Sequence, residues 1–157
     1  MKVSYVEMNI NIRRAEAKDI SDVFELSNSN STRQYSINAN EILWKEHLSW
    51  FNEVLKTEGN VLYVFHDEKN EFLGQVRYNI EFKSAEISIS IVNELKGKGY
   101  GLEILKKSQD LLIREKDIVK IVAIIHGKNI PSIKLFERAG YKFSKSDNDF
   151  SEYILNI

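Results

Sequence analysis

The sequence predicts one α/β (α+β) domain, in which four helices accompany a twisted, mixed and mostly antiparallel sheet of about seven strands. Two observations lead to this prediction. Segments that alternate apolar and polar residues, typical of strands, are interleaved with segments of helical periodicity. The 157 residues, of which 43% are hydrophobic and 29% charged, have the length and composition of one globular domain. We therefore expect a single domain over residues 1–157, with residues 1–7 flexible.

Charge and cysteine content exclude several classes of function. The 22 Lys and Arg residues nearly balance the 23 Asp and Glu residues, so no global basic field favours nucleic acid as a partner. The absence of cysteine excludes disulfides, thiolate metal sites and a cysteine nucleophile, and we predict no metal. The first residues lack the apolar core of a signal peptide, and no apolar run reaches membrane-spanning length. We expect a cytoplasmic protein that does not bind a membrane.

Two helices are predicted in the N-terminal part. A short helix is expected at Asp19–Leu26 and a longer one at Glu41–Lys56, separated by a Ser/Asn-rich loop at Ser27–Ser36. At 100° per residue, one half of the longer helix carries Leu43, Trp44, Leu48, Trp50, Phe51, Val54 and Leu55. His47 falls in the middle of this apolar arc.

Three strands follow, at Asn60–Asp67, Glu71–Phe82 and Ala85–Val92, and a turn through Lys83 and Ser84 joins the last two as a hairpin. The apolar faces of these two strands carry Phe72, Val76, Tyr78, Ile80, Ala85, Ile87, Ile89 and Ile91. The polar faces carry Gln75, Arg77, Asn79, Glu86, Ser88 and Ser90. Because side chains alternate, any register that stacks the apolar sets also stacks the polar ones. A polar face in mid-sheet is a candidate wall of a site.

The C-terminal part completes the order β-α-α-β-β-β-α-β-α-β-β. We expect a helix at Tyr100–Lys116, a strand at Ile118–Gly127, a helix at Ile130–Ala139 and closing strands at Tyr141–Lys145 and Asp149–Ile157. The last helix has strong end signals: Asn129 as N-cap, Pro131 in the first turn and Gly140 just past the end.

Three alternate glycines, Gly97, Gly99 and Gly101, precede the helix at Tyr100 and are interleaved with Lys96 and Lys98. Such glycines let the backbone approach a ligand, and their N–H groups at a helix N-terminus form an anion nest. No G-K-[ST] follows, and the spacing is not G-x-G-x-x-G, so neither common nucleotide motif applies. The turn suits a pyrophosphate, although a flexible turn with solvated lysines is the alternative.

The sequence resembles the GNAT N-acetyltransferases over nearly its whole length. Their [Q/R]-x-x-G-x-[G/A] signature is matched by Lys96, Gly99 and Gly101, with Lys96 in place of the usual Arg or Gln. A second signature, N-x-x-[S/A] followed by an aromatic residue and a GF-like end, is matched by Asn129, Ser132, Phe136 and Gly140. The resemblance implies a single GNAT fold in which the fourth and fifth strands splay apart.

The resemblance also implies acetyl-CoA as the cofactor. Its pyrophosphate would lie on Gly97–Leu102 and its pantetheine arm along the strand edge at Ile89–Asn93, with Asn129 hydrogen-bonding the arm. Asn129 could equally be only a helix cap. The expected cofactor-binding residues are Ile91, Val92, Asn93, Lys96, Gly97, Lys98, Gly99, Tyr100, Gly101, Leu102, Asn129, Ser132 and Phe136.

The catalytic groups are less well defined. Many family members protonate the leaving thiolate with a Tyr seven residues after the motif asparagine, but this chain has Phe136 there. Solvent, Tyr141 or Tyr153 could substitute, or release could need no side-chain acid.

For the general base, Glu86 on the polar face is the first candidate and His126 at the end of the fifth strand the second, with His47 behind them. An ion pair with Arg77 is the competing interpretation of Glu86. A loop histidine is the competing interpretation of His126.

The region of the two N-terminal helices resembles the acetyltransferases of pseudaminic and legionaminic acid synthesis, which act on UDP-4-amino sugars. Their pattern is matched by Asn28, Arg33, Ser36, Ile42, His47, Trp50 and Phe51, and departs at Ser27, where they have Arg. The resemblance implies substrate contacts at Asn28, Arg33, Ser36, His47, Trp50 and Arg77. A core histidine bonded to a backbone carbonyl is the alternative for His47, and a plain surface residue the alternative for Arg33.

Three functions are therefore compared. The first is acetyl transfer from acetyl-CoA to a UDP-amino sugar, which requires Arg33, His47 and Arg77 to converge on one cleft. The second is acetyl transfer to another amine, such as a protein N-terminus, a polyamine or a drug; a cleft lined by carboxylates would favour a cationic acceptor. The third is an acyl-CoA sensor without turnover. The expected partner is a small-molecule amine and, if the chain assembles, a second copy in a homodimer.

Overall fold

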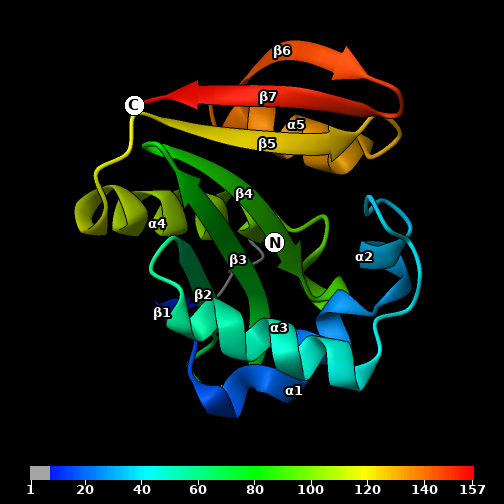
Figure 1. The fold of residues 1–157 in the computed structure, drawn as a ribbon, viewed down its shortest axis with the longest axis vertical. Helices are drawn as coiled ribbons and strands as arrows, with labels where there is room; N and C mark the ends of the chain where they lie inside the picture. The colour runs from blue at the N-terminus through cyan, green and yellow to red at the C-terminus, as the bar shows by residue number, and fades with distance from the viewer. Residues whose placement is uncertain (1–7) are drawn as a thin grey trace, which may run out of the picture.

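A computed structural model describes residues 8–157, so the flexibility expected for residues 1–7 lies outside the described residues. Seven strands form one sheet in the order β1-β2-β3-β4-β5-β7-β6, with β4 and β5 as the parallel pair (Figure 1). The strands are β1 (Asn11–Arg14), β2 (Asn60–His66), β3 (Phe72–Glu81), β4 (Ser84–Ile91), β5 (Lys120–His126), β6 (Lys142–Asp147) and β7 (Phe150–Asn156). The helices are α1 (Ile20–Ser27), α2 (Asn30–Arg33), α3 (Trp44–Lys56), α4 (Tyr100–Glu115) and α5 (Ile130–Arg138), with 3-10 turns η1 (Ala17–Asp19) and η2 (Asn93–Leu95). The predicted order is confirmed, and α2 is an addition to it.

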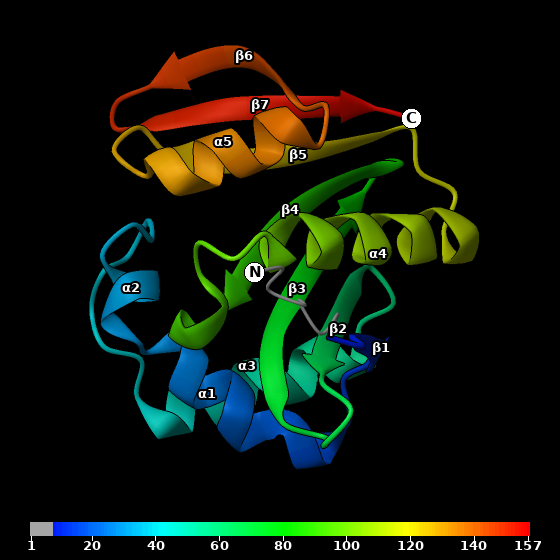
Figure 2. The same cartoon turned by 180° about the vertical axis from the view of Figure 1, so that it is seen from behind.

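The helices lie on both faces of the sheet (Figures 1 and 2). Helices α4 and α5 cover one face, and α1 and α3 cover the β2 end of the other. Strand β2 is therefore buried on both sides: Val61, Tyr63 and Phe65 join the main core, whereas Leu62 and Val64 pack against α1 and α3. The polar side chains of β3 and β4 emerge on this second face, beside α1 and α3.

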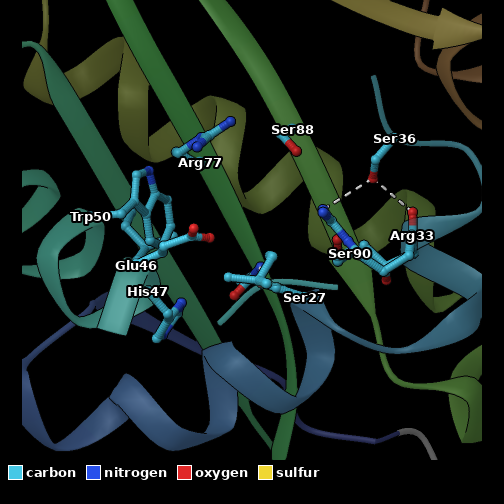
Figure 3. Close-up of a pocket in the computed structure, with 13 residues that line it drawn as sticks. Ser27, Arg33, Ser36, Glu46, His47, Trp50, Arg77, Ser88 and Ser90 are labelled. Atoms are coloured by element: carbon cyan, nitrogen blue, oxygen red, sulfur yellow. Dashed lines mark hydrogen bonds between the residues drawn. The ribbon is translucent and has the colours of Figure 1, made fainter. Parts of the chain in front are cut away.

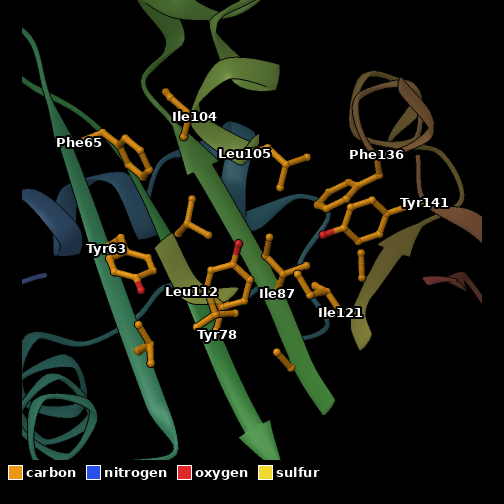
Figure 4. Packing of buried hydrophobic residues seen from close by; sticks show 14 of the residues in the cluster. Tyr63, Phe65, Tyr78, Ile87, Ile104, Leu105, Leu112, Ile121, Phe136 and Tyr141 are labelled. Carbon is orange, nitrogen blue, oxygen red and sulfur yellow. The ribbon is translucent and has the colours of Figure 1, made fainter. Parts of the chain in front are cut away.

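The main core lies between the sheet and the pair α4 and α5 (Figure 4). Tyr78, at the centre of β3, is fully buried, and its hydroxyl is 2.8 Å from the Ser108 hydroxyl of α4. Tyr141 is similarly buried and donates to Oε1 of Gln109 at 2.6 Å. A buried polar group costs free energy unless it is hydrogen-bonded, so both pairs satisfy hydroxyls that the core encloses.

The hairpin of β3 and β4 stacks the polar residues on one face, as the alternation predicts. Arg77 lies opposite Ser88, and Asn79 lies opposite Glu86, so the polar residues share one face. The predicted turn was shifted by one residue, because Phe82 and Lys83, both with positive φ, form the two-residue turn. Neither residue is of a type that usually adopts this conformation, which is why the sequence did not indicate it.

The predicted position of Phe72 is wrong, because a β-bulge interrupts the pairing of β2 and β3. The register between β2 and β3 shifts at Phe65 and His66, so Leu73 enters the main core and Phe72 packs on the opposite face with the α1 and α3 cluster. A bulge reverses the alternation of side chains along a strand. Phe72 therefore does not share a face with Val76, as the uninterrupted alternation predicted.

The apolar arc predicted for α3 was too wide, and the helix begins at Trp44 rather than at Glu41. Its buried positions are His47, Phe51 and Val54, with Trp50 half-buried beside them. Four of the seven apolar residues predicted for the arc are exposed, namely Leu43, Trp44, Leu48 and Leu55. The buried stripe follows the i, i+4, i+7 spacing, since α3 contacts the sheet along only one narrow side.

Strands β4 and β5 splay apart as expected. Their pairing runs from Ser84 with Lys120 to Ile87 with Ala123 and then stops, although both strands continue. Among the described residues, no helix is long and apolar enough to cross a membrane.

Candidate active site

A cavity of about 270 Å³ opens on the polar face of β3 and β4 (Figure 3). Its wall comes from five elements: α1, α2 with the loop that follows it, α3, β2 and the hairpin of β3 and β4. The lining residues are Ser27, Thr32, Arg33, Ser36, Ile42, Glu46, His47, Trp50, Leu62, Gln75, Arg77, Ser88 and Ser90. The polar face predicted in mid-sheet thus forms one wall of a cavity.

Arg77 supplies positive charge to this cavity. Its guanidinium carbon lies 5.4 Å from the centre of the Trp50 ring, a cation–π arrangement that fixes both side chains. Burial lowers the pKa of Arg77, and the negative charge of Glu86 acts in the opposite direction. Because an arginine remains charged in proteins, a partly desolvated guanidinium favours an anionic ligand group beside it.

Arg33 lines the cavity and also stabilises the loop after α2 through hydrogen bonds. Its Nη1 atom donates to the carbonyl of Asn38 at 3.0 Å, and its Nη2 atom donates to the Ser36 hydroxyl at 3.2 Å. Ser36 in turn donates to the carbonyl of Thr32 at 2.8 Å. The buried Nε atom of Arg33 has no hydrogen-bond partner among the described residues. Arg33 is therefore partly buried and hydrogen-bonded to the loop, and it is not a plain surface residue.

Asn28 closes the same loop at its base. Its amide nitrogen donates to the carbonyl of Ile42 at 2.9 Å, and its Oδ1 atom accepts from the Ile42 amide at 2.7 Å. Asn28 itself does not line the cavity. The segment predicted as a loop also contains the short helix α2. The amides of Thr32 and Arg33 both donate to the carbonyl of Ser29 and close a helical turn.

His47 lines the cavity but is almost completely buried, with 2% of its surface exposed. Its Nε2 atom lies 2.9 Å from the carbonyl of Ile20, so the interpretation as a histidine bonded to a backbone carbonyl is confirmed. Burial lowers the pKa of His47, although this hydrogen bond opposes the shift. The ring lies 5.6 Å from that of Trp50. His47 thus fixes α3 to α1 and supports the indole that faces the cavity.

Two of the three candidate bases, Glu86 and His126, lie outside the cavity wall. Glu86 is exposed on β4, beyond Ser88, and the described residues contain no ion pair between Glu86 and Arg77. His126 lies at the end of β5, where its Nδ1 atom accepts from the Lys128 amide at 3.1 Å and its ring contacts Tyr35. The Nδ1 atom of His126 is therefore engaged by a backbone amide.

The glycine turn has the backbone that a phosphate group requires. Gly97 and Gly99 have positive φ values of 76° and 85°, and a Cβ atom on either would meet nothing within 4 Å. Gly99 is the N-cap of α4, and no side chain caps the helix, so its first N–H groups are free for a ligand. Burial lowers the pKa of Lys96, and a nearby anion would favour its charged form. These features fit the pyrophosphate of a cofactor.

The structure also brings the other expected cofactor residues to this turn. A Cβ atom on Gly101 would lie 3.7 Å from Ile91 of β4 and 3.6 Å from Leu135 of α5, so the three elements meet there. Asn129 caps α5 by accepting from the Ser132 amide at 3.4 Å, which confirms the predicted N-cap. Val92 and Asn93 continue from β4 into η2 towards the glycines.

The aromatic residues considered for proton donation are mostly enclosed in the core. Phe136 is 2% exposed and packs edge-on against Tyr141, with ring centres 4.9 Å apart. Burial raises the pKa of Tyr141 far above its ordinary value, and its hydroxyl is bonded to Gln109. Tyr153 is 8% exposed. Tyr141 is therefore poorly placed to protonate a thiolate.

Sequence reasoning missed several residues of the cavity wall. Glu46, which lies beside the apolar arc predicted for α3, was assigned no role. Ser27 was identified only as a departure from the pattern of the amino-sugar acetyltransferases. Gln75 was assigned to the polar face but to no role; its Nε2 atom donates to the Ser27 hydroxyl at 3.1 Å, and its buried Oε1 atom has no partner in the described residues. The polar alternation of β3 was the signal that could have identified Gln75. Within residues 8–157, no group of three acidic or histidine side chains is placed to hold a metal ion.

Comparison with known proteins identifies the family. The profile of the acetyltransferase (GNAT) domain matches residues 9–142. The chain therefore belongs to the GNAT family and is an N-acetyltransferase, a family whose acetyl donor is acetyl-CoA.

Individual relatives agree with this assignment. The chain is 31% identical over 140 residues to a Bacillus subtilis (strain 168) protein named "Putative phosphinothricin acetyltransferase YwnH", covering 83% of this chain and 82% of the relative. A solved domain from Methanocaldococcus jannaschii DSM 2661 superposes with a TM-score of 0.84 at 26% identity, covering 96% of this chain and 100% of that domain. A spermidine N-acetyltransferase from Vibrio cholerae, solved with CoA and spermine, has a TM-score of 0.85 at 19% identity, covering 94% of this chain and 95% of that one. The last likeness shows the shared fold alone.

Proposed function

We propose that this N-acetyltransferase acetylates an amine on an anionic small molecule, specifically the 4-amine of a UDP-linked 4-amino-4,6-dideoxy sugar. One observation carries the proposal: Arg33, His47 and Arg77, far apart in the sequence, line the same cavity. Ser36 and Trp50, which belong to the same sequence pattern, line it too.

The charge of the cavity wall supports an anionic rather than a cationic acceptor. Two arginines, Arg33 and Arg77, face one carboxylate, Glu46. A polyamine carries several positive charges and would be repelled by this wall, since like charges in a partly desolvated site are unfavourable. Arginine forms bidentate hydrogen bonds with phosphates and carboxylates, so two arginines in the wall suit an anionic group of the acceptor.

A second candidate acceptor is a small anionic amino acid such as phosphinothricin. The name of the Bacillus subtilis relative and the size of the cavity favour it. A volume of about 270 Å³ is just below the range of roughly 300–1,000 Å³ for pockets that enclose drug-sized ligands. A sugar nucleotide would place its amino sugar inside and its nucleotide outside, whereas an amino acid would be enclosed completely.

The acetyl donor would be held by the glycine turn. Residues 96–102 would bind the pyrophosphate, and residues 91–93, at the end of β4 and the start of η2, would hold the pantetheine arm in the splay between β4 and β5. Asn129, Ser132 and Phe136 would flank the arm from α5. Acetyl-CoA supplies an activated thioester, and the chain's own part is to position the acceptor amine against it and to exclude competing water.

The experiment is a screen of amine acceptors with release of the CoA thiol as the signal. The UDP-4-amino sugar, phosphinothricin and spermidine are compared at equal concentration, together with the free 4-amino sugar. We expect kcat/KM to be highest for the UDP-amino sugar and much lower for the free sugar, because remote binding of the nucleotide positions the amine. A preference for phosphinothricin would select the second candidate, and a preference for spermidine would contradict an anionic acceptor.

A further inference from the structure

We propose that Glu46 is the catalytic carboxylate that accepts the proton of the acceptor ammonium. The inference rests on the assignment of this cavity to the acceptor, made above, but does not depend on which amine binds. It assigns the base to α3 and not to the sheet.

Glu46 lies in the first turn of α3, four residues before Trp50, so both side chains project from the same side of the helix. It is the single carboxylate in the wall of the cavity. In Figure 3 its carboxylate points away from the helix towards the middle of the cavity, between Arg77 and Ser27 in this view. Over the part of the chain that the structure describes, Glu46 forms no ion pair, so its oxygens are free to accept.

The other titratable groups near the cavity are less suited to this task. His47 has its Nε2 atom on the carbonyl of Ile20 and is enclosed by aromatic rings. Glu86 lies outside the cavity wall. Arg33 and Arg77 are donors only. Of these groups, Glu46 is thus the one that is placed to accept a proton from a bound amine.

Gln75 provides a second hydrogen-bond acceptor in the same cavity. Its Oε1 atom is buried and unpaired, and its amide is held in place by the bond from Nε2 to Ser27. A buried acceptor without a partner costs free energy that a ligand N–H can recover. An ammonium has three N–H groups, so Glu46 and Gln75 can each accept one. Gln75 is accordingly a positioning residue that holds the nitrogen while Glu46 removes a proton.

The step balances without any further reagent. An alkyl ammonium with a pKa near that of lysine, about 10.4, is almost entirely protonated at neutral pH and is not nucleophilic. Glu46 takes one proton, and the nitrogen lone pair attacks the acetyl carbonyl carbon, forming the C–N bond. The C–S bond breaks, and the thiolate takes the second proton lost by the nitrogen, directly or through water. Glu46 then releases its proton to solvent.

The test compares Glu46→Gln with Glu53→Gln, the same substitution at an exposed position of α3 that does not line the cavity. kcat/KM is measured from about pH 6 to about pH 9.5, because the contribution of a general base depends on pH. The acceptor is whichever of the UDP-4-amino sugar, phosphinothricin and spermidine the native chain acetylates best.

We expect Glu46→Gln to lower kcat/KM about 100-fold at pH 7, with most of the loss recovered at the highest pH, where more of the amine is already deprotonated. Glu53→Gln should remain near the native value throughout. Gln75→Leu should raise KM about tenfold and keep the native pH profile, as expected for a lost hydrogen bond. Thermal unfolding of all three variants checks that they fold.

Two results would overturn the proposal. One is a Glu46→Gln profile that matches the native chain, or that is lowered equally at every pH. The other is a pH-dependent loss that appears in Glu86→Gln instead. A preference of the native chain for spermidine would contradict the proposed function but leave this test intact.

Discussion

The glycine turn, proposed for the cofactor, is formed by the backbone, whereas the cavity, proposed for the acceptor, is formed by side chains. The turn at residues 96–102 is made by the backbone: two glycines with positive φ and the free N–H groups of a helix start. The cavity is made by side chains from five elements that meet only in the folded chain. A site formed by the backbone tolerates many substitutions, except those that replace its glycines. A site formed by side chains can change its ligand specificity through a single substitution. The first suits a cofactor common to a family, and the second suits an acceptor that differs among its members.

The largest expected effect is on the backbone site. Gly101→Glu places a carboxylate beside Ile91 and Leu135 at the start of α4, where it repels a pyrophosphate and fills the path along β4. We expect calorimetry to detect no binding of acetyl-CoA. Gly101→Ala is the matched control, because its methyl group has ordinary contact distances of 3.6 Å or more, and it should bind with only modestly reduced affinity. Native affinity in a folded Gly101→Glu chain would contradict the cofactor assignment.

The next effect concerns the start of α1, a helix that forms part of the cavity wall. Asp19, 3% exposed at the start of α1, accepts two hydrogen bonds from Arg13 and one from the Glu16 amide, all at 2.7 Å. Asp19→Asn should lower the free energy of unfolding at pH 7 by about 2 kcal/mol, below the range for fully buried pairs because Arg13 is 33% exposed. Urea denaturation measures this difference.

The pH dependence of the Asp19 contribution has a definite sign. Burial raises the pKa of the Asp19 carboxyl, but the hydrogen bonds from Arg13 and Glu16 outweigh burial and hold the pKa below its usual value. The stabilisation is therefore complete above the unfolded-state pKa of about 3.9 and disappears as the pH falls through the folded value. The native and Asp19→Asn stabilities should converge in acid. A constant difference down to low pH would show that packing, not charge, stabilises the helix start.

A smaller effect is expected where Asn28 closes the loop over the cavity. Asn28→Ala removes both bonds to the backbone of Ile42, so the loop that carries Arg33 and Ser36 loses its fixed base. We expect KM for the acceptor to rise about tenfold, the equivalent of one lost hydrogen bond, with the acetyl-CoA affinity unchanged. Equal losses for both ligands would show that the two sites are not separate.

The smallest effect is expected at Phe136, where many family members have Tyr. Because Phe136 is buried against Tyr141, Phe136→Tyr should leave kcat within about threefold of the native value or raise it slightly. Phe136→Leu should mainly weaken acetyl-CoA binding by loss of packing. A large fall in the rate of thiol release in Phe136→Leu, at native affinity, would show that the ring acts in the chemical step.

The difference between the two sites also explains what the sequence could predict. Strand alternation correctly placed the polar residues of β3 and β4 on one face, and the Asn129 cap was correct, because each depends on residues close in the chain. The bulge at Phe72, the Phe82–Lys83 turn and the exposed half of α3 were missed because they depend on neighbouring strands and on how closely α3 approaches the sheet. For the same reason Glu46 and Gln75 were not identified. Their roles depend on the convergence of α3 with β3, which no local pattern encodes.

The most direct test of two separable sites is a pair of measurements on Arg77→Leu. Arg77 lies on the polar face of β3 against Trp50, on the acceptor side of the sheet. We predict that KM for the acceptor rises about 10- to 100-fold, as expected for a lost charge-assisted hydrogen bond, while the calorimetric Kd for acetyl-CoA stays within about threefold of the native value. An unchanged KM, or an acetyl-CoA Kd weakened as much as KM is raised, would contradict the assignment of this cavity to the acceptor.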